Sequence, residues 1–308
     1  MPKADYIWMD GEMRRWEDCT VHVMSHALHY GSSVFEGIRA YDTPDGPAIF
    51  RLEDHIRRLY QSARMYRIEI PFDPDTVCQA CVDAVRVNKL TAGYLRPLAF
   101  RGAGSVGVTA RDMPIHLIIA AFPWGTYLGP EALEKGVDVA VSSWNRLAPN
   151  TVPPGMKAGG NYLSSMLIGY EAKDRGVAEG IGLGRDGLLS EGSGENLFLI
   201  EDGVIRTPPG AASILKGITR DTVIKLLADM GHEVIEQPLP REALYTADEV
   251  FFTGTAAEIT PIKRVDHIDV GTGDFPVTRA VQEAFFGLFT GKTADPHGWL
   301  HHVKGDTA

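Results

Sequence analysis

The stretch from Met113 to Pro130 carries no Asp, Glu, Lys or Arg, and it constrains the fold more than any other part of the chain. Its apolar centre, LIIAAF at 117–122, is far shorter than the roughly 20 apolar residues that a membrane-spanning helix needs. Pro114, Pro123 and Pro130 interrupt it further. We therefore expect a buried β-strand that leads into a Gly- and Pro-rich connector, with a domain on each side.

Strand and helix patterns alternate on both sides of this connector, which indicates a mixed α+β or α/β architecture. Turn signals at Asp10-Gly11 and at TPDG (43–46) predict two hairpins. Apolar periodicity predicts helices near 52–66, 75–88, 161–173, 219–230 and 277–289, and strands at 93–100, 115–122, 137–144, 181–190 (a hairpin), 196–200 and 249–254. We expect a small domain over 1–122, a connector over 123–134 and a large domain over 135–308.

Composition narrows the class of protein and its partners. The chain has 308 residues, and Lys+Arg 30 against Asp+Glu 40 gives a formal charge of −10. Such a charge argues against a nucleic acid or an anionic membrane as the main partner. The presence of only three cysteines favours a reducing compartment. With acids in place of an apolar leader at the start, we expect a cytoplasmic protein.

Two glycine motifs imitate nucleotide-binding sites without the required context. Gly102–Gly107 reads G-x-G-x-x-G, but a proline and a strand follow it where a dinucleotide fold has a helix. Gly287–Thr293 is one residue short of a P-loop and ends a predicted helix, as a C-cap does. No G-x-S-x-G occurs, so an α/β-hydrolase is not indicated.

Two further groups of residues have structural interpretations. The spacing of His22, His26 and His29 could suit a metal ion, but no acid or cysteine lies near them, and we expect no metal site. Cys78 and Cys81 fall inside a predicted helix, so we interpret them as core residues and leave their redox activity open.

Lys157 is the only charged residue between Arg146 and Glu171. Partial desolvation would lower its pKa and make it a usable nucleophile, although a lysine that extends into solvent is the alternative. Gly217-Ile218-Thr219 opens a predicted helix, with Thr219 as the expected N-cap, and offers N–H groups to a phosphate. The small residues of 253–257 form a second possible anion site at the end of a strand.

Glu191 and Glu195 lie among glycines in 190–196, where a carboxylate could face a cationic ring nitrogen or simply form a solvated turn. An amine, a phosphate site and such a carboxylate together suit pyridoxal 5′-phosphate (PLP).

The motifs that contain these residues resemble those of the class IV aminotransferases, and among them the branched-chain amino acid aminotransferases. They are HALHYGSSVFEGIR (26–39), YLRPL (94–98), KAGGNYLSS (157–165), SEGSGENLF (190–198), LKGITRD (215–221), TGTAAEIT (253–260) and AFFGLFTG (284–291). The resemblance covers essentially the whole chain. It implies the two-domain, D-amino acid aminotransferase-like PLP fold of this class.

The resemblance also implies roles around the cofactor. Lys157 would carry PLP covalently and move the proton at the substrate, Tyr162 would bond the PLP phenolate, and Glu191 would keep the pyridine nitrogen protonated, with Glu195 structural. The residues implied for the phosphate site are Gly217, Ile218, Thr219, Thr255 and an arginine on the first long helix. Periodicity does not choose between Arg57 and Arg58, whereas the resemblance implies Arg58.

The substrate residues follow in the same way. The resemblance implies an aliphatic pocket made by Tyr30, Phe35, Gly37, Trp124 and Tyr127, with Thr255 and Ala256 at the α-carboxylate. Arg96, with Tyr30, would receive the distal carboxylate of glutamate. The loop 104–108 and Tyr30 would reach the pocket from a neighbouring subunit, so we expect a homo-oligomer, either a dimer or a dimer-based hexamer.

This chain departs from the family pattern at Val106, which shortens the pocket cover, and at Lys216, which adds a cation near the phosphate site.

The activity implied is transfer of the amino group between leucine, isoleucine or valine and 2-oxoglutarate by a ping-pong mechanism. Two other class IV activities, D-amino acid aminotransferase and aminodeoxychorismate lyase, are alternatives with the same cofactor residues. A protein that binds PLP without catalysis is a third, but intact Lys157, Tyr162 and Glu191 speak against it.

Overall fold

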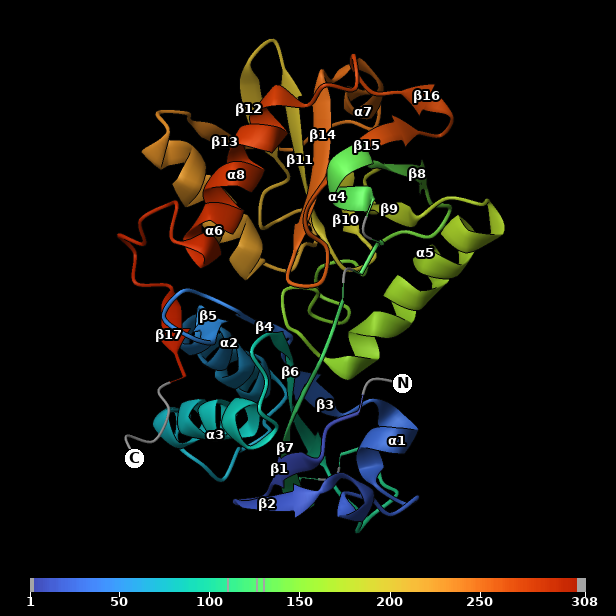
Figure 1. The fold of residues 1–308 in the computed structure, drawn as a ribbon. Helices are drawn as coiled ribbons and strands as arrows, with labels where there is room; N and C mark the ends of the chain where they lie inside the picture. The colour runs from blue at the N-terminus through green and yellow to red at the C-terminus, as the bar shows by residue number, and fades with distance from the viewer. Residues whose placement is uncertain (1–2, 110, 126, 130, 304–308) are drawn as a thin grey trace. The chain divides into compact units, whose positions relative to one another are not determined.

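A computed structural model of the chain describes residues 3–109, 111–125, 127–129 and 131–303 (Figure 1). The chain divides into unit 1, made of 1–125, 156–160 and 288–308, and unit 2, made of 126–155 and 161–287. The first boundary falls inside the expected connector 123–134. Residues 156–160 and 288–308 differ from the expectation, because they belong to unit 1. Strand pairing gives the reason: β17 (Leu300–His302) adds to the sheet of unit 1, and Ala158 bridges to Val34.

Unit 1 is built on a sheet whose strands run β17-β5-β4-β6-β7-β1-β2, with β3 also paired to β6. All of these pairs are antiparallel. The strands are β1 (Tyr6–Met9), β2 (Glu12–Arg15), β3 (Ser33–Phe35), β4 (Ile38–Tyr41), β5 (Ala48–Phe50), β6 (Gly93–Arg101) and β7 (Ile115–Phe122). Both hairpins predicted for this unit are confirmed, and Asp10 and Gly11 have the positive φ values that the tight turn requires.

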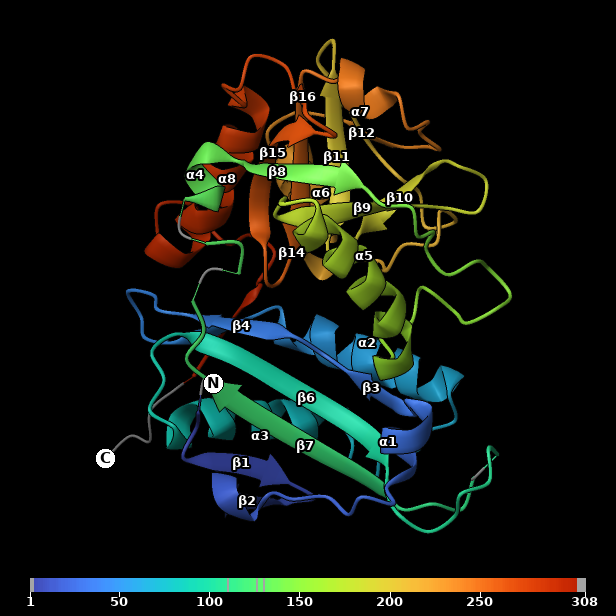
Figure 2. The same cartoon turned by 90° about the vertical axis from the view of Figure 1, so that its right-hand side faces the viewer.

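Helices α2 (Leu52–Met65) and α3 (Pro74–Val87) cover one face of this sheet, as Figure 2 shows. Asp73 caps α3 by accepting from the Thr76 amide at 2.8 Å, with Pro74 at the first helical position. Buried apolar residues of the two helices and of β4, β6 and β7 form one core. The short helix α1 (His26–Tyr30) and the 3₁₀ turn η1 (Trp16–Asp18) lie outside that core.

Unit 2 contains a second sheet in the order β10-β9-β8-β15-β14-β11-β12-β13, with β16 at β15. Its strands are β8 (Val137–Val141), β9 (Glu179–Leu183), β10 (Leu189–Gly192), β11 (Asn196–Glu201), β12 (Val204–Thr207), β13 (Val234–Glu236), β14 (Glu249–Gly254), β15 (Glu258–Val265) and β16 (Ile268–Asp269). β8 runs parallel to both β9 and β15, so this sheet is mixed.

Within unit 2, α5 lies on one side of the sheet, and α6 and α8 lie on the other (Figure 1). The helices are α4 (Ala132–Lys135), α5 (Tyr162–Asp174), α6 (Ile218–Asp229), α7 (Ala243–Thr246) and α8 (Pro276–Thr290), with η2 (Gly159–Asn161) before α5. α8 continues past the unit boundary at 287.

One predicted helix start is wrong. We expected Thr219 to cap α6, but Gly217 occupies the cap position and Thr219 lies inside the first turn. Gly291 has a φ of 72° directly after α8, as predicted for a helix end. Among the residues that the structure describes, none of the helices combines the length and apolar character needed to cross a bilayer.

Candidate active site

Lys157 lies in the segment of unit 1 that precedes η2, and its backbone is held on both sides. Its amide donates to Ser62 Oγ at 3.1 Å, and its carbonyl accepts from the Phe35 amide at 3.0 Å. Its Nζ lies 5.0 Å from the centre of the Phe35 ring. The side chain is half-buried, and its charge contributes to lowering the pKa of buried His55, after burial itself and the charge of Arg58. The backbone of Lys157 is therefore positioned by β3 and α2.

Arg58 points inward from α2, whereas Arg57 points outward. The Arg57 side chain is 65% exposed and pairs with Asp54, but the Arg58 side chain is 11% exposed. Arg58 binds both oxygens of Glu36, at 2.7 and 2.8 Å. The structure thus separates two arginines that helical periodicity leaves equivalent.

Arg96 lies on β6 in an aromatic setting. Its guanidinium carbon is 4.8 Å from the Phe35 ring centre and 5.3 Å from that of Tyr94, and its Nη2 donates to the Tyr94 hydroxyl at 3.2 Å. Tyr94 also contacts the ring of Trp124, with centroids 5.2 Å apart. A Cβ at Gly37 would meet the Tyr94 hydroxyl at 1.9 Å, so only glycine fits there. These contacts bring together four of the expected pocket residues.

Tyr94 was not predicted as a site residue. A signal was present, since residues two apart on a strand share a face, and Tyr94 precedes Arg96 by two on β6.

Tyr30 and His26, both on α1, hold the loop 104–108. The Tyr30 hydroxyl donates to the Val106 carbonyl at 2.7 Å, and His26 Nε2 lies 3.0 Å from the Gly107 carbonyl. Val106 is 63% exposed and Tyr30 46% exposed. In unit 1 as described, Tyr30 therefore belongs to the loop rather than to the group around Arg96.

Glu191 is a buried residue of β10, not part of a solvated turn. Its Oε1 contacts Arg146 Nη2, and its Oε2 accepts from Asn196 Nδ2 at 2.9 Å and from the Leu215 amide at 3.1 Å. Glu191 and Arg146 are 4% and 8% exposed, respectively. A paired and hydrogen-bonded carboxylate of this kind stays ionised, which suits a contact with a cationic ring nitrogen.

Arg146 and Asn196 were also missed. Arg146 lies far from Glu191 in sequence, and only the fold brings the two together.

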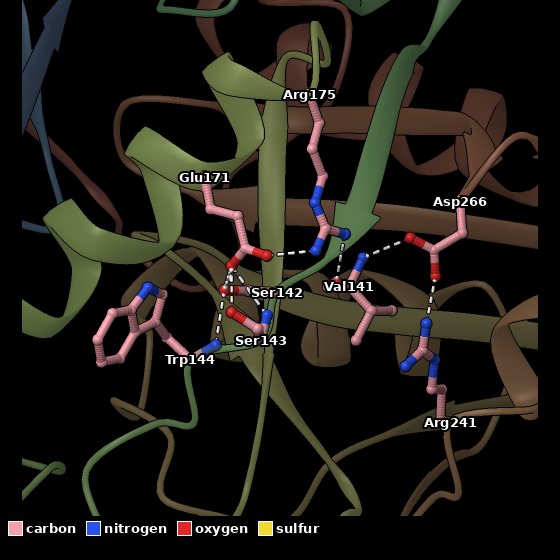
Figure 3. A network of polar contacts seen from close by, with 8 residues as sticks. All are labelled: Val141, Ser142, Ser143, Trp144, Glu171, Arg175, Arg241 and Asp266. Carbon is pink, nitrogen blue, oxygen red and sulfur yellow. Dashed lines mark hydrogen bonds and ion pairs between the residues drawn. The ribbon is translucent and has the colours of Figure 1, made fainter.

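The segment between β8 and Arg146 is fixed by a polar network (Figure 3). Glu171 of α5 accepts from Ser142 Oγ and from the Ser143 amide, at 2.5 and 2.8 Å. Arg175 contacts Glu171 and donates to the Val141 carbonyl at 3.0 Å. On the far side of β8, Asp266 accepts from the Val141 amide and from Arg241.

After this network the chain follows β9, where the Arg146 amide donates to the Leu183 carbonyl at 2.8 Å. A Cβ at Gly182 would meet Arg146 Cγ at 2.8 Å, so glycine lets the arginine pass toward Glu191.

Glu195 is equally buried but differs in its electrostatics. Burial, and then the charge of neighbouring Glu179, raises the pKa of the Glu195 carboxyl well above its ordinary value. Burial also raises the pKa of Glu179. The protonated form of Glu195 is therefore favoured more than in an exposed carboxyl, whereas Glu191 forms an ion pair with the buried Arg146.

The remaining expected residues of unit 2 lie at helix starts and turns. Tyr162 is the first residue of α5, and Ile218 and Thr219 open α6 after Gly217, which provides no side-chain cap. Thr255 and Ala256 form the turn between β14 and β15, and Ala256 lines one small pocket with Tyr127 and Leu128. Lys216, just before α6, is exposed.

The surroundings of the histidines in 22–29 and of the two cysteines in α3 indicate structural roles. His26 is buried and bonds Ser32 Oγ at 2.7 Å, while His22 and His29 are exposed. Over the described part of the chain, no cluster of three or more potential metal ligands occurs. Burial raises the pKa of Cys78 to about 12 and that of Cys81 well above its ordinary value, so neither thiol is activated.

Comparison with known proteins gives matches along nearly the whole chain. Residues 33–265 match the family described as Amino-transferase class IV. The branched-chain-amino-acid aminotransferase of Escherichia coli (strain K12) is 59% identical over 304 residues, which is 98% of each chain. A crystal structure of the Escherichia coli branched-chain amino acid aminotransferase superposes with a TM-score of 0.97 at 58% identity, covering 98% of this chain and 100% of that one.

A further solved structure is similar and carries a ligand. It is a branched-chain amino acid aminotransferase from T.th., complexed with N-(5′-phosphopyridoxyl)-L-glutamate, with a TM-score of 0.94, 44% identity, and coverage of 99% of this chain and 100% of that chain.

Proposed function

We propose, from the premise that this chain belongs to the class IV aminotransferase family, that it transfers the amino group between L-leucine, L-isoleucine or L-valine and 2-oxoglutarate. The products are branched-chain 2-oxo acids and L-glutamate, formed in a ping-pong sequence. The fold is that of class IV aminotransferases, and the cofactor is PLP, as expected from the sequence. Similarity to branched-chain-amino-acid aminotransferases over 98% of the chain carries the assignment.

The donor groups of each unit fit PLP. Unit 1 presents an amine at Lys157 and an inward arginine at Arg58. Unit 2 presents the ionised Glu191 and a helix that begins at Ile218 without a side-chain cap. The Thr253 hydroxyl, in register with Asn196, is buried and has no hydrogen-bond partner among the described residues. An anionic phosphate and a protonated ring nitrogen would complement these groups.

Bound PLP supplies a cationic ring that accepts the electron pair of the substrate Cα–H bond. In our proposal Lys157 holds the cofactor and carries the proton released from the substrate Cα. Glu191 keeps a proton on the ring nitrogen, and Tyr162 donates a hydrogen bond to the phenolate oxygen. Arg58 and the N–H groups of Ile218 and Thr219 bind the phosphate, together with Gly217 and Thr255.

The substrate residues are assigned in the same way. Arg96, with Tyr30 of a neighbouring subunit, receives the distal carboxylate of glutamate, and Thr255 and Ala256 receive the α-carboxylate. Phe35, Gly37, Trp124 and Tyr127 contact the aliphatic side chain. The aromatic neighbours of Arg96 support this dual use, because a guanidinium can stack on rings in one half-reaction and bind a carboxylate in the other.

We also propose that the protein is a homo-oligomer, a dimer or a dimer-based hexamer. Exposed apolar side chains support this. Leu163, Met166, Leu167 and Tyr170 follow helical spacing on α5 and are 40–65% exposed. Val21, Val23, Met24 and Leu28 form a second exposed set in unit 1. Light scattering should give a mass of two or six chains, and Leu163→Glu with Met166→Glu should lower it if α5 is an interface.

A cytoplasmic location is proposed as well, since Cys19, Cys78 and Cys81 are all free thiols.

A panel of amino donors with 2-oxoglutarate tests the proposed activity. L-Leucine, L-isoleucine and L-valine should each give L-glutamate, and D-leucine should give no glutamate of either hand. Turnover of D-leucine, or release of 4-aminobenzoate from aminodeoxychorismate, would instead support the alternative class IV activities.

A further inference from the structure

Glu36 of unit 1 is a fully buried carboxylate to which the mechanism above gives no task. Its exposed fraction is 0%. Both of its oxygens bind Arg58, Oε1 to Nε at 2.7 Å and Oε2 to Nη2 at 2.8 Å, and Oε2 also accepts from His55 Nδ1 at 2.8 Å. A planar pair of this kind fixes the orientation of a guanidinium as well as its position.

The backbone around Glu36 is itself held in place. The Glu36 amide donates to the Pro97 carbonyl of β6 at 2.8 Å, which anchors the turn between β3 and β4. His55, Arg58 and Ser62 occupy one face of α2 at i, i+3 and i+7. The next turn of the same face therefore holds the backbone of Lys157 through Ser62. Side chains of α2 therefore hold both the Glu36 carboxylate and the backbone of Lys157.

In this cluster one cation, Arg58, balances the negative charge of Glu36. Burial opposes ionisation, but Arg58 and His55 hold the pKa of Glu36 well below its ordinary value. Burial, with the charges of Arg58 and Lys157, lowers the pKa of His55, so His55 donates to Glu36 as a neutral ring. The Glu36 pair engages Nε and Nη2 of the guanidinium.

We propose that Glu36 is a positioning residue that orients the Arg58 guanidinium toward the phosphate group of PLP. This inference rests on the proposed cofactor. A negative charge beside Arg58 weakens its attraction for phosphate, so Glu36 would help binding only through geometry. An arginine held in one orientation loses less side-chain entropy when it binds an anion than a mobile one does.

The test compares PLP with pyridoxal, which lacks the phosphate, by titrating apoprotein and following cofactor absorbance. Glu36→Asp keeps the charge but shortens the side chain, so it cannot reach both guanidinium nitrogens. We expect it to weaken PLP binding by about tenfold or more and to leave pyridoxal binding within about twofold. Asp54→Asn is the matched control, since Asp54 lies on the same helix and pairs with Arg51 and Arg57 instead. It should change neither affinity.

Dependence on Arg58 is tested by a double-mutant cycle. In an Arg58→Gln background, Glu36→Asp should have no further effect on PLP affinity. If Glu36→Asp does not fold, Glu36→Gln replaces it, because a glutamine keeps the length of the side chain but accepts from only one guanidinium nitrogen, and it should lose the same preference for PLP.

Three results would overturn the proposal. They are equal losses for PLP and pyridoxal, no loss for either, and tighter PLP binding by Glu36→Gln, which would show that the carboxylate acts through charge alone. Failure of the proposed function is distinguishable, since wild-type protein would then not bind PLP more tightly than pyridoxal.

Discussion

Arg146 donates to Glu191 within the interior of unit 2, and both side chains are almost completely enclosed. The arginine reaches this position because the segment after β8 is held by Glu171 and because Gly182 leaves room beside β9. A buried carboxylate with a fixed counter-ion stays ionised, which is the property that the proposed contact with the ring nitrogen needs.

Replacing Arg146 with methionine should destabilise the apoprotein strongly. It would leave Glu191 buried without its cation, which costs about 3–5 kcal/mol of unfolding free energy. Urea denaturation measures this. Arg206→Met is the control, because the Arg206–Glu201 pair on neighbouring strands of unit 2 is partly exposed and should contribute about 1 kcal/mol or less. Equal losses of unfolding free energy in the two variants would mean that the buried pair contributes no more to stability than the partly exposed one.

Glu191→Gln should retain PLP but lose about 10²–10³-fold in kcat, since the ring nitrogen would no longer be held as a cation. Glu195→Gln should be nearly silent in the same assay, because the raised pKa favours the neutral form of Glu195, which glutamine resembles in shape. Steady-state kinetics with L-leucine and 2-oxoglutarate compares them. A large loss for Glu195→Gln with a silent Glu191→Gln would show that the assigned acid is the wrong one.

Arg96→Gln should separate the two half-reactions. It should lower kcat/KM toward glutamate and 2-oxoglutarate by about 10²–10³-fold, or about 2–4 kcal/mol, because an unpaired carboxylate would enter an aromatic pocket. The half-reaction with leucine should change by less than about tenfold, since Arg96 then rests on Phe35 and Tyr94. Single-turnover absorbance changes measure each half. Equal losses would identify Arg96 as a structural residue.

The buried Glu195 should make stability fall as the pH rises. Below the ordinary value of 4.5 both states hold the proton. Above it the unfolded chain releases the proton while the folded protein, whose pKa is raised, retains it. Glu195→Gln removes this difference, so its unfolding free energy relative to wild type should increase as the pH rises above 4.5. Glu233→Gln, at an exposed position, is the control. A pH-independent difference for Glu195→Gln would contradict the assignment.

Local patterns predicted much of the fold. Apolar periodicity located α2, α3, α5, α6 and α8 to within a few residues, and turn residues located the hairpins. The strands β12, β13, β15 and β17 were not predicted, and neither was the return of 288–308 to unit 1. Their positions depend on pairing with distant strands, such as β17 with β5, which no local pattern records.

The candidate site shows the same difference between residues that local patterns predict and partners that only the fold brings together. The sequence pointed to Lys157 and Glu191 through uncharged and glycine-rich surroundings, and the family resemblance supplied their roles. The partners that fix them come from other elements: Ser62 holds the backbone of Lys157, and Arg146 and Asn196 bind Glu191. Burial decided what spacing left open: it separated Arg58 from Arg57 and showed that Glu191 is not in a solvated turn.

Covalent attachment of PLP to Lys157 is the centre of this account, and borohydride reduction of the PLP-loaded protein tests it most directly. Reduction makes the link permanent, and mass spectrometry of a digest then locates it. We predict a phosphopyridoxyl group on Lys157 alone, and in Lys157→Ala retention of noncovalent PLP with amino transfer lowered by at least about 10²–10⁴-fold. A label on Lys216 or another lysine, or substantial transamination by Lys157→Ala without added amine, would contradict the account.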